Sequence, residues 1–336
     1  MKFHGDWLPE RMERFRRIES VFRKTCLTHG FGEVRTPIIE KLHWFTGAGI
    51  LSPDLMHKVY SFLDWDGWSG ERVVLRPDNT VPVCRLFAEH FASQKKARLF
   101  YVEDVFRYES AEKSGGRRCQ MGVEILGDFS HPNARDTEAL ALLLDFLNAL
   151  KPENTRLVLG HAGILHAWLK TLGLSDKEEL DAFDLLMEGR LEELQKLCDG
   201  RGCMCGLNRL LELEGSSSAF LANLKALGHE STGFCKAVED LEEVASCLEA
   251  LGINFEINTL IQKDLTYYTG LMFDIYVNGA KVGGGGRYDN LLSKFPGEAA
   301  GGCGFCLYVE PLMAALAAEA SDQDPCPGIC LAADLG

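Results

Sequence analysis

The spacing of apolar and polar residues along the chain predicts both helices and strands, without an internal repeat. Phe15, Ile18 and Phe22 recur at helical spacing, which predicts a first helix that ends at Gly30. The same reasoning predicts helices over residues 80–92, 136–150, 288–293 and 310–319. In the helix that starts at residue 80, Thr80 is the expected N-cap, because its hydroxyl can accept a hydrogen bond from an amide of the first turn.

Strands are predicted where β-branched and aromatic residues lie between turn signals. Their ranges are 31–39, 58–64, 72–76, 98–109, 119–127, 156–159, 254–258, 271–277, 281–284 and 301–308. Pro37 interrupts the first strand, which places it at a sheet edge or an interface. Asn278 and Gly279 are a strong signal for a type I′ turn. Because hairpins outnumber strand–helix–strand crossovers, we expect an α+β fold with a mainly antiparallel sheet.

The helical pattern is almost continuous from residue 161 to residue 251, with breaks at glycines. This block is the best candidate for a helical insertion between two parts of one core. We therefore predict a first core segment over residues 1–160, the insertion over 161–251, a second core segment over 252–320 and a linker-like tail over 321–336.

The composition is that of an ordinary soluble globular protein, with 336 residues of which 46% are hydrophobic and 25% charged. No run of about 18 apolar residues occurs and the first residues have no secretory pattern, so we expect a cytoplasmic protein that does not bind a membrane. The formal charge of −14 argues against a general polyanion binder but leaves room for a local anion site. The twelve cysteines have no paired zinc-ligand spacing, so no metal site is expected.

Arg107 and Glu109 are candidates for binding an anion. They lie two residues apart on a predicted strand, so both side chains leave the same face. The basic, glycine-bearing segment 110–118 follows directly, and a guanidinium offers a bidentate fork for phosphate or carboxylate. The alternative is an exposed ion pair on the surface of a sheet.

Gln120, Gly122 and Glu124 also share one face of their strand. A carboxylate beside an amide can hold an ammonium group or an imidazole N–H. Asp78 and Thr80 add a second acid and a hydroxyl, although residues of this kind at a helix start are more often caps than ligand groups.

Lys263, Tyr267 and Tyr268 precede a run of four glycines at residues 283–286. Successive glycines at the end of a strand permit the close approach of a ligand to the backbone, or simply a turn. The run is not a dinucleotide-binding fingerprint, because no GxGxxG pattern opens a helix after a parallel strand.

Together these segments resemble the catalytic core of the class II aminoacyl-tRNA synthetases, and specifically of the histidine enzyme. Residues 32–37 are similar to the first class motif, whose strand and preceding helix form the dimer interface. Residues 106–109 and 120–124 are similar to the second motif, whose arginine meets the α-phosphate of ATP. Residues 265–268 and 284–289 are similar to the segments that close over histidine. The resemblance covers residues 5–320 and implies an antiparallel sheet flanked by helices, with a helical insertion.

The sequence departs from the ligase pattern in three places. Pro311 stands where the third class motif ends in an ATP-binding arginine, and proline has neither charge nor donor. Lys263, followed by Asp264, stands where the family has its catalytic arginine and a glycine. Losing one such positioned group costs about 10²–10³ in rate, so adenylate chemistry is not expected. Only residues 326–336 lie beyond the linker, so no anticodon-binding domain is expected either.

These departures, together with residues 75–80, 267–271 and 286–292, resemble a paralogous family: the regulatory subunits of short-form ATP phosphoribosyltransferase, the first enzyme of histidine biosynthesis. The resemblance implies a protein without catalysis of its own, a catalytic subunit as partner, L-histidine as feedback effector, and a homodimer within a hetero-oligomer. No cofactor and no tRNA are implied. The alternatives are a histidine–tRNA ligase core and another synthetase-like paralogue.

The resemblance and the patterns above define one set of candidate histidine-binding residues, with acids for the α-ammonium and imidazole and a cation for the carboxylate. The set is Asp78, Thr80, Arg107, Gln120, Glu124, Lys263, Tyr267, Tyr268, Gly284 and Gly285.

Overall fold

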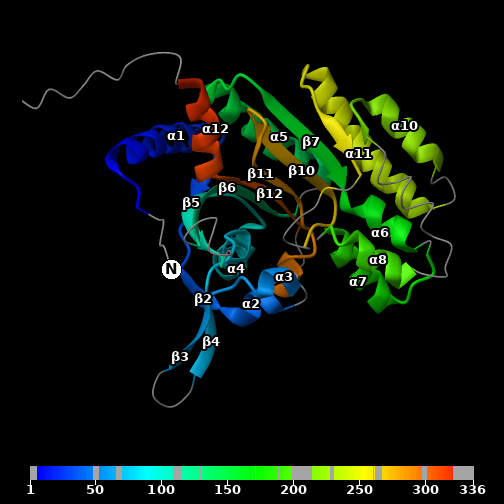
Figure 1. Cartoon of the computed structure of the whole chain (residues 1–336), viewed down its shortest axis with the longest axis horizontal. Coiled ribbons are helices and arrows are strands. Elements are labelled where there is room, and N and C mark those ends of the chain that lie inside the picture. The colour runs from blue at the N-terminus through cyan, green and yellow to red at the C-terminus, as the bar shows by residue number, and fades with distance from the viewer. Residues whose placement is uncertain are drawn as a thin grey trace, which may run out of the picture.

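The computed structural model describes residues 6–47, 53–65, 70–108, 116–128, 131–170, 172–187, 189–198, 214–227, 231–259, 261, 267–296 and 301–320. Within these residues the centre of the molecule is a nine-stranded sheet in the order β1-β5-β6-β12-β11-β10-β7-β9-β8 (Figure 1). A second sheet, in the order β2-β4-β3, projects from one end. The strands are β1 (Gly32–Glu33), β2 (Ile39–Lys41), β3 (Ser61–Trp65), β4 (Gly70–Leu75), β5 (Lys96–Phe106), β6 (Arg117–Gly127), β7 (Thr155–His161), β8 (Glu214–Gly215), β9 (Glu256–Asn258), β10 (Leu271–Val277), β11 (Ala280–Arg287) and β12 (Gly301–Tyr308).

Helices cover both faces of the large sheet. They are α1 (Pro9–Thr28), α2 (Leu42–Thr46), α3 (Pro53–Met56), α4 (Thr80–His90), α5 (Pro132–Leu150), α6 (Ala162–Lys170), α7 (Asp176–Met187), α8 (Leu191–Cys198), α10 (Ser218–Leu227), α11 (Thr232–Ala250) and α12 (Val309–Ala320), with short 3₁₀ turns η1 (Ala92–Gln94) and η2 (Leu292–Lys294). Helices α1, α5 and α12 lie over one face and α4 over the other (Figure 1). None of the described helices is long and apolar enough to cross a membrane.

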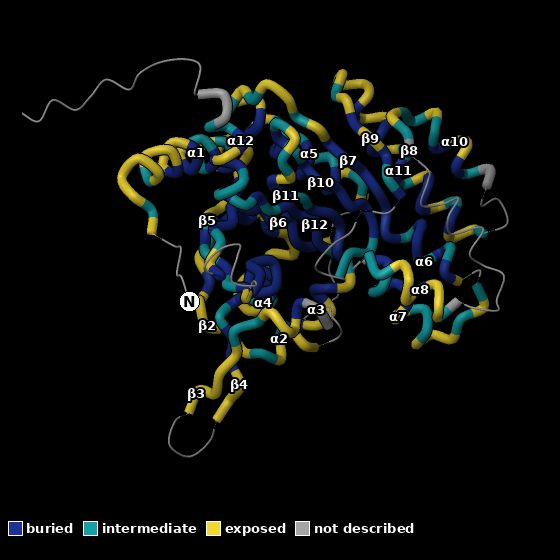
Figure 2. Tube along the Cα trace, viewed as in Figure 1, coloured by how far each residue is buried: buried dark blue, intermediate teal, exposed yellow. Residues whose placement is uncertain are grey.

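The sheet is buried on both faces, so its central strands form the core (Figure 2). On the α1/α5 face, Phe22 packs edge-on against Phe100 and Phe146, with ring centroids 6.1 and 5.2 Å apart. On the α4 face, Phe87 packs in a separate buried cluster with Tyr101 and Tyr288. Burial of large aromatic side chains on both faces dominates the energetics of such a core.

The predicted fold class is confirmed. In the described residues the large sheet is antiparallel throughout except for the β1–β5 and β7–β9 pairs. The predicted type I′ turn is confirmed too, since Asn278 and Gly279 have φ values of 49° and 80°. The strand predicted over 301–308 coincides with β12.

Four local predictions are wrong. No helix spans 288–293, where only η2 is helical, because the backbone of Tyr288 continues the sheet by donating to the Gly302 carbonyl at 2.7 Å. Residues 31–39 contain only the two-residue β1 and the first residue of β2. Of the two alternatives for the glycine run, the turn is wrong, because residues 283–286 lie inside β11. Thr80 is the first helical residue of α4 and not its N-cap, which is Asn79.

The block predicted as a helical insertion contains α6, α7, α8, α10 and α11, with the two-residue β8 among its described residues. Helix α11 returns to pack beside α6 and α10 and over the end of β7 (Figure 1). The division of the chain at residues 160, 251 and 320 stays a prediction.

Candidate functional site

The candidate residues on β6 lie on the face of the sheet that α4 covers. Alternation along β6 directs Gln120, Gly122 and Glu124 to this face, as predicted. The register places Gly122 between Tyr101 of β5 and Cys306 of β12, and Glu124 beside Gly304 of β12. Three neighbouring strands therefore form the floor of one site.

Glu124 is the centre of this site. It is 1% exposed, and Thr80 Oγ1 donates a 2.7 Å hydrogen bond to its Oε1. Tyr288 donates its hydroxyl to Oε2, and the Tyr101 hydroxyl lies 3.4 Å from Oε1. Burial raises the pKa of Glu124 to about 8, against the hydroxyl hydrogen bonds, which lower it. Within the described residues no Lys, Arg or His side chain forms an ion pair with Glu124.

Asp78 precedes α4, and Arg107, the residue after β5, reaches the same segment with its side chain. Asp78 is 2% exposed and accepts a hydrogen bond from the Val81 amide at 3.2 Å. Burial raises the pKa of the Asp78 carboxyl, while the nearby Arg107 guanidinium lowers it. Arg107 is 4% exposed and donates from Nε to the Pro77 carbonyl at 2.7 Å, so the alternative of an exposed ion pair is wrong for Arg107. Glu109 lies outside the described residues.

Gln120 is held from two sides. Asn79 donates from Nδ2 to Gln120 Oε1 at 3.1 Å, and Gln120 Nε2 lies 3.7 Å from Cys306 Sγ. The amide is fully buried. Its orientation is therefore fixed by groups of α4 and β12 before any ligand is present.

Tyrosines form one wall of the site. The rings of Tyr267 and Tyr268 lie 4.9 Å apart, and Tyr267 packs edge-on against Tyr288 at 5.5 Å between centroids. Burial raises the pKa of each of these three phenols well above its ordinary value, so all of them stay neutral donors.

Glycines permit the close packing of these groups on the strands. A Cβ at Gly304 would collide with the Glu124 carboxylate and the Val123 carbonyl, and one at Gly122 with the Tyr101 ring. A Cβ at Gly286 would lie 2.8 Å from the Tyr268 ring, at a φ of 155° that disfavours side chains.

The structure brings together most of the predicted residues. We call the resulting group the Glu124 site: Asp78, Thr80, Tyr101, Gln120, Glu124, Tyr267, Tyr268 and Tyr288. Of the two predicted glycines, Gly284 pairs with Cys306 and lies on the same face, whereas Gly285 pairs with Phe305 and lies on the opposite face. Lys263 lies outside the described residues.

The predicted set lacks Tyr101, Tyr288 and Asn79. Tyr288 follows β11 two residues after Gly286, so alternation could have placed it on the site's face had the strand been extended far enough. No local pattern indicates that Asn79 bonds to a strand 41 residues further along the chain.

Comparison with known proteins identifies the family of the chain and its fold. The model of the histidyl-tRNA synthetase family matches residues 4–312, so the chain belongs to this family. The solved structure of an ATP phosphoribosyltransferase regulatory subunit/histidyl-tRNA synthetase from Bacillus halodurans superimposes with a TM-score of 0.79 at 26% identity, over 94% of this chain and 83% of that one. The predicted fold, that of the class II aminoacyl-tRNA synthetases, is thereby confirmed.

Within the family, the chain is more similar in sequence to a regulatory subunit than to a histidine–tRNA ligase. The chain is 40% identical to the ATP phosphoribosyltransferase regulatory subunit of Dehalococcoides mccartyi over 318 residues, which cover 94% of this chain and 76% of the relative. It is 32% identical to the histidine–tRNA ligase of Bacillus subtilis over 350 residues, which cover 98% of this chain and 77% of the relative. The predicted resemblance to the regulatory subunits is confirmed.

Proposed function

We propose that this chain is the regulatory subunit of an ATP phosphoribosyltransferase and that it binds histidine in the Glu124 site. The first part is supported by the 40% identity to a relative of that name over almost the whole chain. The feature of the site that favours a cationic amino acid most is Glu124, a fully buried carboxyl whose described hydrogen-bond partners are hydroxyl groups. An ammonium group would supply the positive charge that this carboxyl needs in order to ionise.

The remaining residues suit the other parts of histidine. Asp78, also buried, accepts an imidazole N–H or shares the ammonium, and the amide of Gln120 offers both donor and acceptor. The rings of Tyr267 and Tyr268 provide a flat apolar surface for the imidazole. Arg107 or Lys263 balances the carboxylate of the ligand.

The same fold lacks a group that ligation would need. Pro311, the third residue of α12, occupies the position of the third-motif arginine and offers no cation and no backbone donor to a phosphate. We therefore infer that the chain binds histidine without activating it.

Assembly completes the proposed role. We infer a homodimer through α1 and the edge strand β1, where Leu27 is 62% exposed at the end of the helix. The dimer would bind the catalytic subunit in the cytoplasm, and histidine would inhibit the enzyme by binding the inhibited assembly more tightly than the active one.

Co-purification with a short-form catalytic chain tests the function as a whole. We expect a stable complex whose synthesis of phosphoribosyl-ATP requires this chain and falls when histidine is added. Absence of both a complex and an effect on activity would remove the proposal. ATP–pyrophosphate exchange that depends on histidine would instead support a ligase core.

Calorimetric titration with histidine tests the site. Tyr268→Ala should weaken binding at least tenfold, because it removes one face of the aromatic wall. Tyr276→Ala is the matched control, since this half-buried tyrosine of β10 packs against Arg156 instead. Normal histidine binding by Tyr268→Ala would rule out this location.

A further inference from the structure

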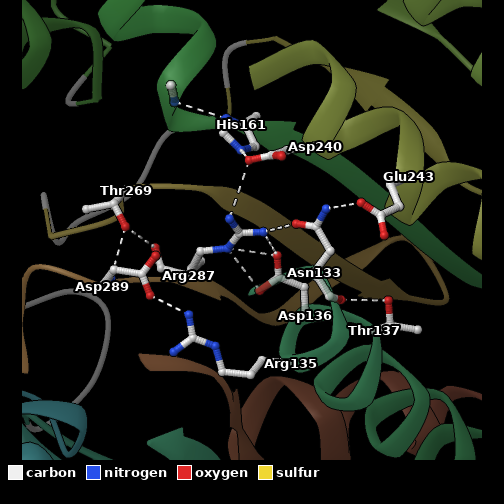
Figure 3. Close-up of polar contacts among 11 residues, drawn as sticks. Asn133, Arg135, Asp136, Thr137, His161, Asp240, Glu243, Thr269, Arg287 and Asp289 are labelled. Carbon is white, nitrogen blue, oxygen red and sulfur yellow. Dashed lines mark hydrogen bonds and ion pairs between the residues drawn. The ribbon is translucent and has the colours of Figure 1, made fainter. Parts of the chain in front are cut away.

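Arg287 lies next to the Glu124 site in sequence but points to the other face of the sheet. Gly286 and Tyr288 face the site, so alternation directs Arg287 toward α5 and α11. Figure 3 shows its guanidinium among side chains from these two helices. Arg287 is 5% exposed, so this charge is buried.

The guanidinium joins two helices to the strand. Its Nε donates to Asp136 Oδ2 of α5 at 3.0 Å, and its Nη2 also contacts Asp136 and Asn133. Its Nη1 lies 3.5 Å from Asp240 Oδ2 of α11 (Figure 3). Asp136 is fully buried. His161 Nε2 lies 3.9 Å from Asp240, but its imidazole is neutral because burial lowers its pKa to about 3. Arg287 thus compensates the charges of both Asp136 and Asp240.

The backbone of Arg287 holds the aromatic wall. Its carbonyl accepts a hydrogen bond from the Thr269 amide at 2.8 Å, and Thr269 Oγ1 accepts one from the Asp289 amide at 2.9 Å. Gly270 packs directly on the Arg287 side chain, where a Cβ would lie 2.7 Å from Cδ. The segment that carries Tyr267 and Tyr268 is therefore fastened to the residue that α5 and α11 hold.

Tyr288 completes the connection to Glu124. Its hydroxyl donates to Glu124 Oε2, and its amide is fixed by the Gly302 carbonyl at 2.7 Å. Because Arg287 and Tyr288 share a peptide bond, a shift of Arg287 toward or away from the helices must move Tyr288 relative to Glu124.

We propose that Arg287 is a positioning residue that couples the Glu124 site on one face of the sheet to α11 on the other. The choice of histidine as the ligand rests on the function proposed above. The contacts that define the coupling do not depend on it. Only the planar fork of arginine can reach Asp136, Asn133 and Asp240 at once, whereas a lysine is a point charge. Coupling through such a network is reciprocal, so histidine binding should also tighten α11.

Two variants and a matched control test the coupling. Asp240→Asn should weaken histidine binding about fivefold in calorimetry without altering the melting temperature appreciably. Glu239→Gln makes the same chemical change one residue away, on the exposed side of α11 where Glu239 pairs with Lys225, and should leave binding unchanged. Histidine should slow amide hydrogen exchange in α11 of the wild type and of Glu239→Gln, but less in Asp240→Asn.

A measurement without ligand separates this proposal from the proposed function. Arg287→Lys should raise the pKa of Glu124, followed by NMR of labelled glutamate carboxyls, because a displaced Tyr288 no longer donates to the carboxylate. Asp240→Asn should also raise the pKa of Glu124, but by less, and it provides the test if Arg287→Lys does not fold. Unchanged Glu124 titration in the variants that fold would overturn the coupling, even if the wild type binds histidine. If the wild type does not bind histidine but the variants show the raised pKa of Glu124, only the identity of the ligand is refuted.

Discussion

Thr80 and Glu124 are joined by a 2.7 Å hydrogen bond from Oγ1 to Oε1, between the first residue of α4 and the middle of β6. The bond places a buried carboxyl at the positive end of a helix, where a negative charge is favoured. Burial therefore raises the pKa of Glu124 while the helix end lowers it, and burial prevails in the absence of a ligand. A site poised in this way responds strongly to an added cation.

Replacing Thr80 by valine tests this relationship. Thr80→Val keeps the shape of the side chain but removes the donor, so we expect a loss of about 1 kcal/mol in the free energy of unfolding and weaker histidine binding. Urea unfolding and calorimetry measure the two effects. Thr25→Val is the control, because Thr25 donates to the Val21 carbonyl within α1, far from the site in sequence and on another helix. Equal histidine affinity in both variants would show that the hydroxyl has no role in binding.

Histidine binding should be accompanied by proton release from Glu124. Its pKa of about 8 means that the ligand-free carboxyl is mainly protonated at neutral pH, whereas an ammonium ligand requires the ionised form. We expect the affinity to rise about fivefold from pH 7 to pH 8, and the heat of binding to depend on the ionisation enthalpy of the buffer. Glu124→Gln should bind weakly and independently of pH in this range. A pH-independent wild type would exclude Glu124 as the partner of the ammonium group.

Local sequence patterns correctly predicted those features of the site that depend only on residues close together in the chain. Alternation placed Gln120 and Glu124 on one face, and the Asn278–Gly279 pair marked its hairpin, because both depend on backbone geometry alone. Thr80 looked like a helix cap for the same local reason. Its hydroxyl bonds instead to Glu124, 44 residues away, and Asp78 accepts from the first turn of α4.

Contacts between distant segments explain what the patterns missed. The helix predicted over 288–293 does not form, because Tyr288 extends β11 by donating to the Gly302 carbonyl of β12. No local pattern indicates the side-chain partners of Arg287, because Asp136 on α5 and Asp240 on α11 are remote in the chain. Nothing in a single stretch of sequence says which face of a strand a helix will later cover.

Gly304 should tolerate no side chain. A Cβ there would collide with the Glu124 carboxylate and with the backbone of β6, so Gly304→Ala should cost about 1–3 kcal/mol of stability and abolish histidine binding. Gly233→Ala is the control: in α11 its Cβ would meet only Ala167 Cβ, at 3.8 Å, and alanine favours the helix. Chemical denaturation and calorimetry check both variants. A Gly304→Ala protein that binds histidine like the wild type would contradict the close packing of Glu124 on β12.

His161 should make the protein sensitive to mild acid. Its folded pKa of about 3 lies below the unfolded value of 6.5, so between these values only the unfolded chain takes up a proton and stability falls as the pH falls. From pH 7 to pH 5 we expect this residue to remove about 2 kcal/mol from the free energy of unfolding. His161→Asn keeps an acceptor for the Gly163 amide, which lies 3.1 Å from Nδ1, but cannot be protonated. Denaturant unfolding at the two pH values should therefore show a smaller loss in His161→Asn than in the wild type. An equal loss would mean that His161 takes up its proton equally in the folded and the unfolded protein, which contradicts a lowered folded pKa.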